Sequence, residues 1–136
     1  MSLCVIVIFG SLFSYTDIKR HIIPNSYLLV MSLVIACSIL FAKDWWHHLF
    51  VGFYIIVGLI CFQWLTAGVV GMGDIKYLAL LGFLTGSMEI FLKGLQYSLL
   101  LSSLFAILIF IHGSSIKACV PLAPPISLGF LLALIL

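Results

Sequence analysis

The feature of this sequence that most limits its fold is that apolar runs fill almost all of it. Apolar residues occupy 65% of the 136 positions and charged residues only 7%, whereas a soluble domain has about 25% charged residues. This composition excludes a soluble enzyme, a nucleic-acid-binding protein and a disordered chain. The net charge of +2 gives no sign of a polyanionic partner. We therefore expect an all-α polytopic membrane protein.

Polar and helix-breaking residues divide the chain into six apolar segments. Each has about 15–18 residues, or roughly 23–27 Å of helix at 1.5 Å per residue. Because the hydrocarbon core is about 30 Å thick, flanking residues or local thinning must complete each crossing. Since the short loops leave no room for a second domain, we predict one domain, residues 1–136, folded as a compact bundle of about six transmembrane helices. The segments cover roughly 2–16, 26–42, 49–66, 75–92, 95–112 and 119–136.

The distribution of basic residues indicates how the bundle is oriented. With the N-terminus outside, the cytoplasmic loops carry Lys19, Arg20, Lys76 and Lys117, and the opposite side carries Lys43 and Lys93. This excess favours that orientation under the positive-inside rule, although a re-entrant fourth segment would change it. The first segment lacks the basic start and cleavage site of a signal peptide, so we expect it to remain in the mature protein.

Only four acidic residues are present, so each can be considered singly. We interpret Asp44 as a solvated loop charge, and Glu89 as a surface charge near the end of the fourth segment, paired with Lys93 four residues on. Asp17 and Asp74 stand at the predicted cytoplasmic ends of apolar segments. An ionisable group at membrane depth is costly, and it therefore suggests a functional role.

The first aspartate precedes a basic loop that ends in Pro24-Asn25. Pro24 suits the first turn of the next helix, and Asn25 or Ser26 is expected to help cap it. Taken alone, this loop also allows a simpler interpretation, in which Asp17 pairs with Lys19 or Arg20 in a hairpin.

The second aspartate follows Gly71-Met72-Gly73, where glycines permit a turn or a close approach. Asp74 then falls at the predicted N-cap of the fourth helix. Lys76 is expected either to polarise a substrate carbonyl or hold Asp74 in place, or to anchor the helix at the membrane surface. Two aspartates at one membrane face suit aspartyl chemistry, in which a carboxylate activates water and a carboxylic acid protonates the amide.

Together these residues resemble the type IV prepilin peptidases, which are bacterial G-x-G-D intramembrane aspartyl proteases. Asp17, Pro24 and Asn25 are similar to the family pattern D-x6-P-N. Gly71, Gly73, Asp74 and Lys76 are similar to G-x-G-D-x-K, and the proline-rich entry to the last helix has its counterpart in Pro121, Pro124 and Pro125, followed by Gly129. Longer members carry two C-x-x-C pairs and methylate the new N-terminus. This chain lacks those pairs and resembles the short, protease-only form.

The resemblance implies an aspartic endopeptidase of the bacterial inner membrane. Its partners would be the bilayer and type IV prepilin or pseudopilin precursors, cut after a glycine between a basic leader and a hydrophobic helix, at the cytoplasmic face. Asp17 and Asp74 would be catalytic, and the supporting or substrate-binding residues would be Gly71, Gly73, Lys76, Pro24, Asn25 and Pro124. We expect no cofactor, no metal, no nucleic acid and no methyltransferase activity.

Three further expectations concern details of the bundle. Helix dipoles favour an ionised Asp74 at a helix start and a protonated Asp17 at a helix end, which makes Asp74 the base and Asp17 the acid. Gly82 and Gly86 form a G-x-x-x-G pair in the fourth segment, for internal helix packing or for contact with a substrate helix. The four cysteines lack metal-ligand spacing and are expected to pack between helices.

Three alternatives stay open. A catalytically inactive relative would assist assembly of a pilus or secretion system. A small transporter or channel subunit would use the aspartates to bind a cation, but Gln63 and Gln96 are almost the only other polar groups available inside the helices. The chain is also compatible with a truncated product.

Overall fold

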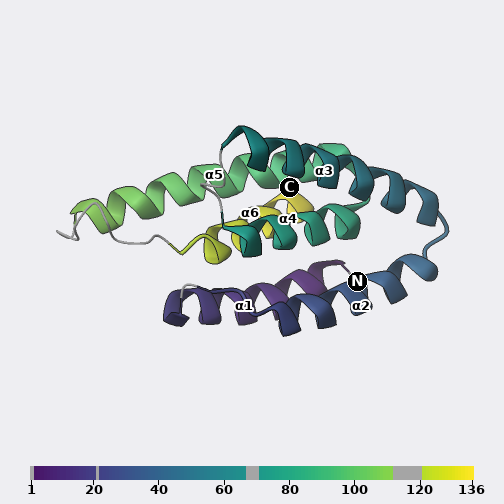
Figure 1. The fold of residues 1–136 in the computed structure, drawn as a ribbon, viewed down its shortest axis with the longest axis horizontal. Helices are drawn as coiled ribbons and strands as arrows, with labels where there is room; N and C mark the ends of the chain where they lie inside the picture. Colours follow the sequence, from purple (N-terminus) through teal and green to yellow (C-terminus); the bar gives the residue numbers. More distant parts are fainter. Residues whose placement is uncertain (1, 21, 67–70, 112–120) are drawn as a thin grey trace.

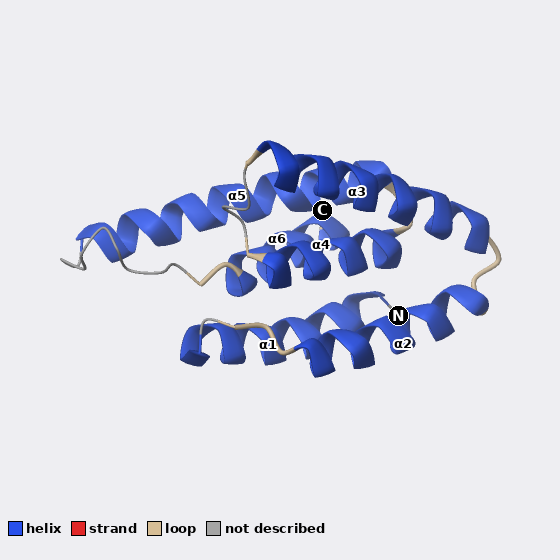
Figure 2. Ribbon diagram, in the orientation of Figure 1, coloured by secondary structure: helices blue, strands red, loops and turns tan. Residues whose placement is uncertain are grey.

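The protein is all-helical in the part that the structure describes. A computed structural model describes residues 2–20, 22–66, 71–111 and 121–136, and every regular element in these ranges is an α-helix (Figure 2). The helices are α1 (Ser2–Arg20), α2 (Asn25–Leu40), α3 (Trp45–Leu65), α4 (Met72–Thr85), α5 (Met88–Ile111) and α6 (Ala123–Ile135). The described ranges thus contain as many helices as the sequence has predicted apolar segments.

The predicted boundary between the fourth and fifth segments is wrong. The helix α4 ends at Thr85 because Gly86 adopts a left-handed conformation, with φ of 59°, which glycine enters at little cost. Thr85, Gly86 and Ser87 interrupt the apolar run at this turn, and the predicted segment boundaries passed over this turn signal. Glu89 consequently lies in the first turn of α5, where it forms the expected ion pair with Lys93 at 2.8 Å.

The G-x-x-x-G pair serves internal structure. A Cβ atom on Gly82 would lie 2.8 Å from Cδ1 of Ile55, so this glycine lets α4 approach α3. Gly86 is the C-cap of α4, and the ring of His48 covers it. Of the two expected uses, the structure supports internal packing.

The helices form three layers. The helices α4 and α6 lie between the α1–α2 pair and the α3–α5 pair (Figure 1). In α6, eight of the 13 residues are buried, whereas only three of the 21 residues of α3 are buried. The central helices are therefore covered mainly by protein, and the outer helices present apolar side chains to their surroundings.

Helix length follows the layers except at α2, an outer helix that is short. The helices α1, α3 and α5 are long and apolar enough to cross a membrane, whereas α2 and α6 are apolar but shorter. The 14 residues of α4 extend only about 21 Å at 1.5 Å per residue. Length and composition thus support a membrane protein with three candidate spans.

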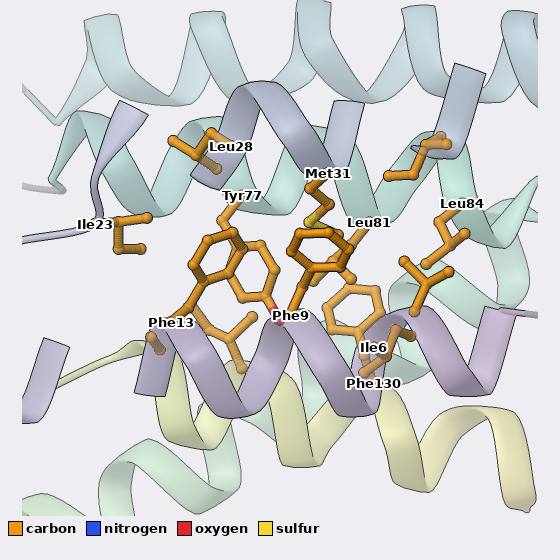
Figure 3. Packing of buried hydrophobic residues seen from close by; sticks show 14 of the residues in the cluster. Ile6, Phe9, Phe13, Ile23, Leu28, Met31, Tyr77, Leu81, Leu84 and Phe130 are labelled. Atoms are coloured by element: carbon orange, nitrogen blue, oxygen red, sulfur yellow. The ribbon is translucent and has the colours of Figure 1, made fainter. Parts of the chain in front are cut away.

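An aromatic core fixes how α1 and α4 face each other. Phe13 and Tyr77 are fully buried and meet edge to face, with ring centroids 4.8 Å apart (Figure 3). Phe13 lies four residues before Asp17, and Tyr77 lies three residues after Asp74. This contact therefore holds side by side the ends of α1 and α4 that carry the two aspartates.

The expectation that the cysteines pack between helices is wrong for the three that the structure describes. Cys4, Cys37 and Cys61 are exposed, and Cys119 lies outside the described residues. Lipid is as apolar as a protein core, so an apolar side chain does not reveal which of the two it faces.

Candidate active site

The first aspartate is buried inside α1. Asp17 lies one turn before the end of the helix, and its Oδ2 accepts a hydrogen bond of 2.8 Å from the backbone N–H of Ala123. Lys19 does not pair with it, because the Lys19 ammonium lies over the ring of Tyr15. The side chain of Arg20 lies outside the described part of the structure. Asp17 is therefore anchored by a backbone amide.

The proline-rich entry to α6 explains why that amide is available. Ala123 is the first residue of α6, and Pro124 and Pro125, both buried, follow it. Prolines have no N–H, and the amide of Ile126 already donates to the carbonyl of Leu122. Ala123 is thus the helix-start donor that still needs an acceptor, and the Asp17 carboxylate supplies it.

The second aspartate lies in the first turn of α4. Gly71 is the N-cap residue and Asp74 the third residue of the helix, so the predicted N-cap position for Asp74 is wrong. Its half-buried carboxyl accepts no hydrogen bond from any residue in the described ranges. A Cβ atom on Gly71 would lie 3.0 Å from Asp74 Oδ2. Gly71 therefore leaves the space in which this carboxyl lies.

The structure places the two aspartates at the same end of the bundle. This is the end where α1 ends and α4 and α6 begin, and the ring contact of Phe13 with Tyr77 holds α1 and α4 side by side one turn away. The residues around them meet. A Cβ atom on Gly73 would lie 3.2 Å from Cβ of Ile23, and Lys76 Nζ donates a hydrogen bond of 3.2 Å to Asn25 Oδ1.

These contacts revise the predicted roles of three supporting residues. Pro24 is the N-cap residue of α2, and its carbonyl accepts from Tyr27 and Leu28. Asn25 does not cap the helix, because its side chain accepts from Lys76. Lys76 forms no ion pair with Asp74 in the described ranges. The lysine and the asparagine instead link the start of α4 to the start of α2.

A comparison with known families identifies the chain. A model described as the type IV leader peptidase family matches residues 4–111. The chain belongs to the type IV leader peptidase family. No curated protein and no solved structure matches it. Membership supports a leader-peptidase-like protease in general, and the match spans Asp17 and Asp74 but ends before α6.

This leader peptidase family member also has a buried hydrogen bond between α4 and α6, one helical turn from the aspartates, that the sequence analysis did not predict. Tyr77 and Ser127 share a hydrogen bond of 2.9 Å between their hydroxyl oxygens, and Ser127 Oγ also lies 2.8 Å from the carbonyl oxygen of Ala123 and 3.5 Å from that of Gly10. A Cβ atom on Gly10 would lie 2.8 Å from Cβ of Ser127. This contact joins α1, α4 and α6 about one turn below the aspartates, and no sequence signal distinguishes its members from other residues in apolar runs.

The position of Asp17 also changes the argument from helix dipoles about which aspartate is ionised. The sequence places Asp17 near the negative end of α1, but the structure places its carboxylate at the positive end of α6 as well. Asp74 lies in the first turn of α4, as the dipole argument assumed. Among the described residues, no three His, Cys, Asp or Glu side chains gather as metal ligands.

Proposed function

We propose that this leader peptidase family member is an aspartic endopeptidase that removes the basic leader from type IV prepilin-like precursors. It cleaves after a glycine, at the cytoplasmic face of the inner membrane. One observation supports the proposal: in a chain of this family, Asp17 and Asp74 lie at the same end of the bundle, where α1 ends and α4 and α6 begin. The bilayer and the precursor are its partners, and the reaction needs no cofactor.

The proposed chemistry divides the work between the two carboxyl groups. An ionised carboxylate removes a proton from water as the water oxygen attacks the carbonyl carbon of the scissile amide. A carboxylic acid then protonates the amide nitrogen as the C–N bond breaks. Because two neighbouring carboxyl groups do not both ionise readily, one of them holds a proton at the start of the cycle.

We assign the base to Asp17 and the acid to Asp74. This reverses the assignment from the sequence, which considered only the dipoles of α1 and α4. The amide of Ala123 donates to Asp17, and the positive end of α6 faces it, and both favour the carboxylate. Asp74 receives no such hydrogen bond from the described residues, which leaves it free to hold and deliver the proton.

The orientation of the bundle follows from its charged ends. Lys19 and Lys76 lie at the end that holds the aspartates, whereas Lys43 and Lys93 lie at the other end. We therefore place the aspartates on the cytoplasmic side and the N-terminus outside, with six crossing segments. A basic leader stays in the cytoplasm while the apolar segment enters the bilayer, so their junction comes to the depth of Asp17 and Asp74.

The test is cleavage of a candidate precursor in membranes that contain the protein. The variants Asp17→Asn and Asp74→Asn remove one carboxyl group each and keep its shape. Asp44→Asn is the matched control, because Asp44 lies at the start of α3 and its side chain makes no capping hydrogen bond. We expect the native protein and the control to release the leader, and the two site variants to lose at least roughly three orders of magnitude in rate.

Two results would contradict the proposal. Cleavage that survives either site substitution shows that the two aspartates are not the catalytic pair. A native protein that accumulates in the membrane but cuts none of several precursors favours an inactive family member that assists assembly.

A further inference from the structure

An elongated apolar groove leads along the outer layer to Asp74. It has a volume of about 440 Å³ and lies between α3, α4, α5 and α6. The positions that mark its course are Tyr54, Gly58, Phe62, Asp74, Met88 and Ser102. Along α5 it extends from Met88 to Ser102, which is about 21 Å at 1.5 Å per residue. Asp74 lies at the end of the groove where α4 begins.

The groove is lined mainly by apolar side chains, and its polar groups are the Asp74 carboxyl, the Tyr54 hydroxyl and two serine hydroxyls. The serine hydroxyls in it are occupied by their own helix, because Ser98 donates to the carbonyl of Leu95 and Ser102 to that of Ser98. Asp74 is the one charged side chain in its lining. A lipid acyl chain would fill the apolar part but offer nothing to this carboxyl. A peptide offers apolar side chains along the groove and amide groups at its end.

A second apolar groove of similar volume serves as a comparison, because it lacks Asp74. It has a volume of about 410 Å³ and lies on the other side of the contact between α3 and α4. Lys76 and Gln63 line it, but Asp74 does not. A precursor held there would bring its basic leader toward the Lys76 ammonium without reaching the Asp74 carboxyl. The groove that contains Asp74 is therefore the one suited to an apolar peptide with a basic leader.

We infer that the groove lined by Asp74 holds the apolar segment of the precursor, with the scissile bond at Asp74 and the leader beyond it. This inference rests on the proposed function, because it assumes that Asp74 acts on the bound peptide. Helix-in-groove binding uses this arrangement of apolar walls. The peptide enters sideways from the bilayer, since α3 and α5, which line the groove, form one of the two outer layers of the bundle (Figure 1).

Gly58 offers a way to fill the groove without disturbing the fold. It is exposed in the groove, and a Cβ atom there would meet nothing within 4 Å. A larger side chain at this position therefore has room in the free protein and occupies space that the precursor needs. Cys61 lies on the same helix and is exposed, and it lines neither of these two grooves.

The experiment compares Gly58→Ala, Gly58→Leu and Gly58→Phe with Cys61→Phe in the precursor cleavage assay. We expect KM to rise with side-chain size at position 58, so that Gly58→Phe loses about tenfold or more in kcat/KM. Cys61→Phe stays within about twofold of the native protein. If Gly58→Phe and Cys61→Phe cleave equally well while Asp17→Asn and Asp74→Asn are inactive, the proposed function stands and the groove is wrong.

A second measurement does not depend on cleavage. A benzophenone amino acid is placed at position 58 or 61, and the membranes are irradiated with a labelled precursor present. We expect an adduct with the apolar segment of the precursor from position 58 and little from position 61. Adducts with lipid alone at position 58, or equal precursor adducts at both positions, overturn the inference even if the protein proves inactive.

Discussion

At the scale of single residues, the anchoring of Asp17 distinguishes it from Asp74. The Asp17 carboxylate is buried and satisfies the first amide of α6, whereas the Asp74 carboxyl makes no hydrogen bond with the described residues. A buried amide that loses its acceptor costs more than the net value of one hydrogen bond. Asp17 therefore has a structural role in addition to its proposed chemical one.

This difference predicts the stability of four variants. Asn keeps an oxygen that can accept from Ala123, whereas Ala leaves that amide without a partner. We expect Asp17→Ala to lower the free energy of unfolding by about 1–3 kcal/mol relative to Asp17→Asn. Asp74→Ala and Asp74→Asn should differ by less than about 0.5 kcal/mol. Unfolding in detergent micelles measures both differences, and equal values within the Asp17 pair would show that the amide finds another partner.

Asp17 and Asp74 could be identified from the sequence because acidic residues are rare in it. Only four acidic residues occur among 136, and burying a charge in an apolar surrounding is costly enough to demand a reason. Ala123 could not be found in this way, because every residue except proline carries an amide. Its importance depends on a carboxylate 106 positions earlier in the chain.

At the scale of helices, the contact between α5 and α6 holds the helix that anchors Asp17. A Cβ atom on Gly129 would lie 2.7 Å from Cα of Ser98, and one on Gly94 would lie 2.8 Å from Cδ1 of Phe130. Small residues let helix backbones approach closely where lipid removes the hydrophobic drive for association. The position of Ala123, at the start of α6, depends on this approach.

We therefore expect Gly129→Ala to destabilise the protein, although alanine favours helix by about 1 kcal/mol over glycine. The added methyl group meets the backbone of Ser98, which has no flexible end to move aside. The free energy of unfolding should fall by about 1–3 kcal/mol, and precursor cleavage should fall with it. Gly58→Ala is the control, since its methyl group enters open space and should leave stability equal or slightly higher. A Gly129→Ala protein as stable as the control would show that α5 and α6 separate easily.

At the scale of the whole molecule, the central layer gathers the proposed chemistry at one end. The helices α4 and α6 lie in the middle of the bundle. Ser127 of α6 hydrogen-bonds both to Tyr77 of α4 and to the carbonyl of Gly10 in α1, and so joins the three helices. The long helices α3 and α5 form the opposite outer layer (Figure 1). Short helices can occupy the central layer of the bundle because neighbouring helices, rather than lipid, cover most of their surface.

The orientation of the whole bundle can be tested by labelling. We expect a single cysteine at Lys43→Cys to react with a membrane-impermeant maleimide added to intact cells. A cysteine at Lys19→Cys should react only after the cells are made permeable. Both side chains are exposed, and the background has its native cysteines replaced. Labelling of Lys19→Cys in intact cells would place the aspartates outside and contradict the proposed orientation.

The sequence by itself determined that the chain is helical, that six apolar segments form it and that Asp17 and Asp74 are its exceptional residues. Apolar runs and isolated charges carry this information locally, because a long apolar run favours helix whatever surrounds it. The prediction missed the helix end at Gly86, although Thr85, Gly86 and Ser87 carry a turn signal there. It was also wrong at the described cysteines, because lipid and core are equally apolar. Only the tertiary structure decided that α4 and α6 lie inside, that Ala123 binds Asp17 and that Tyr77 meets Ser127. Each of these depends on partners distant in the chain, and helix packing alone brings such partners together.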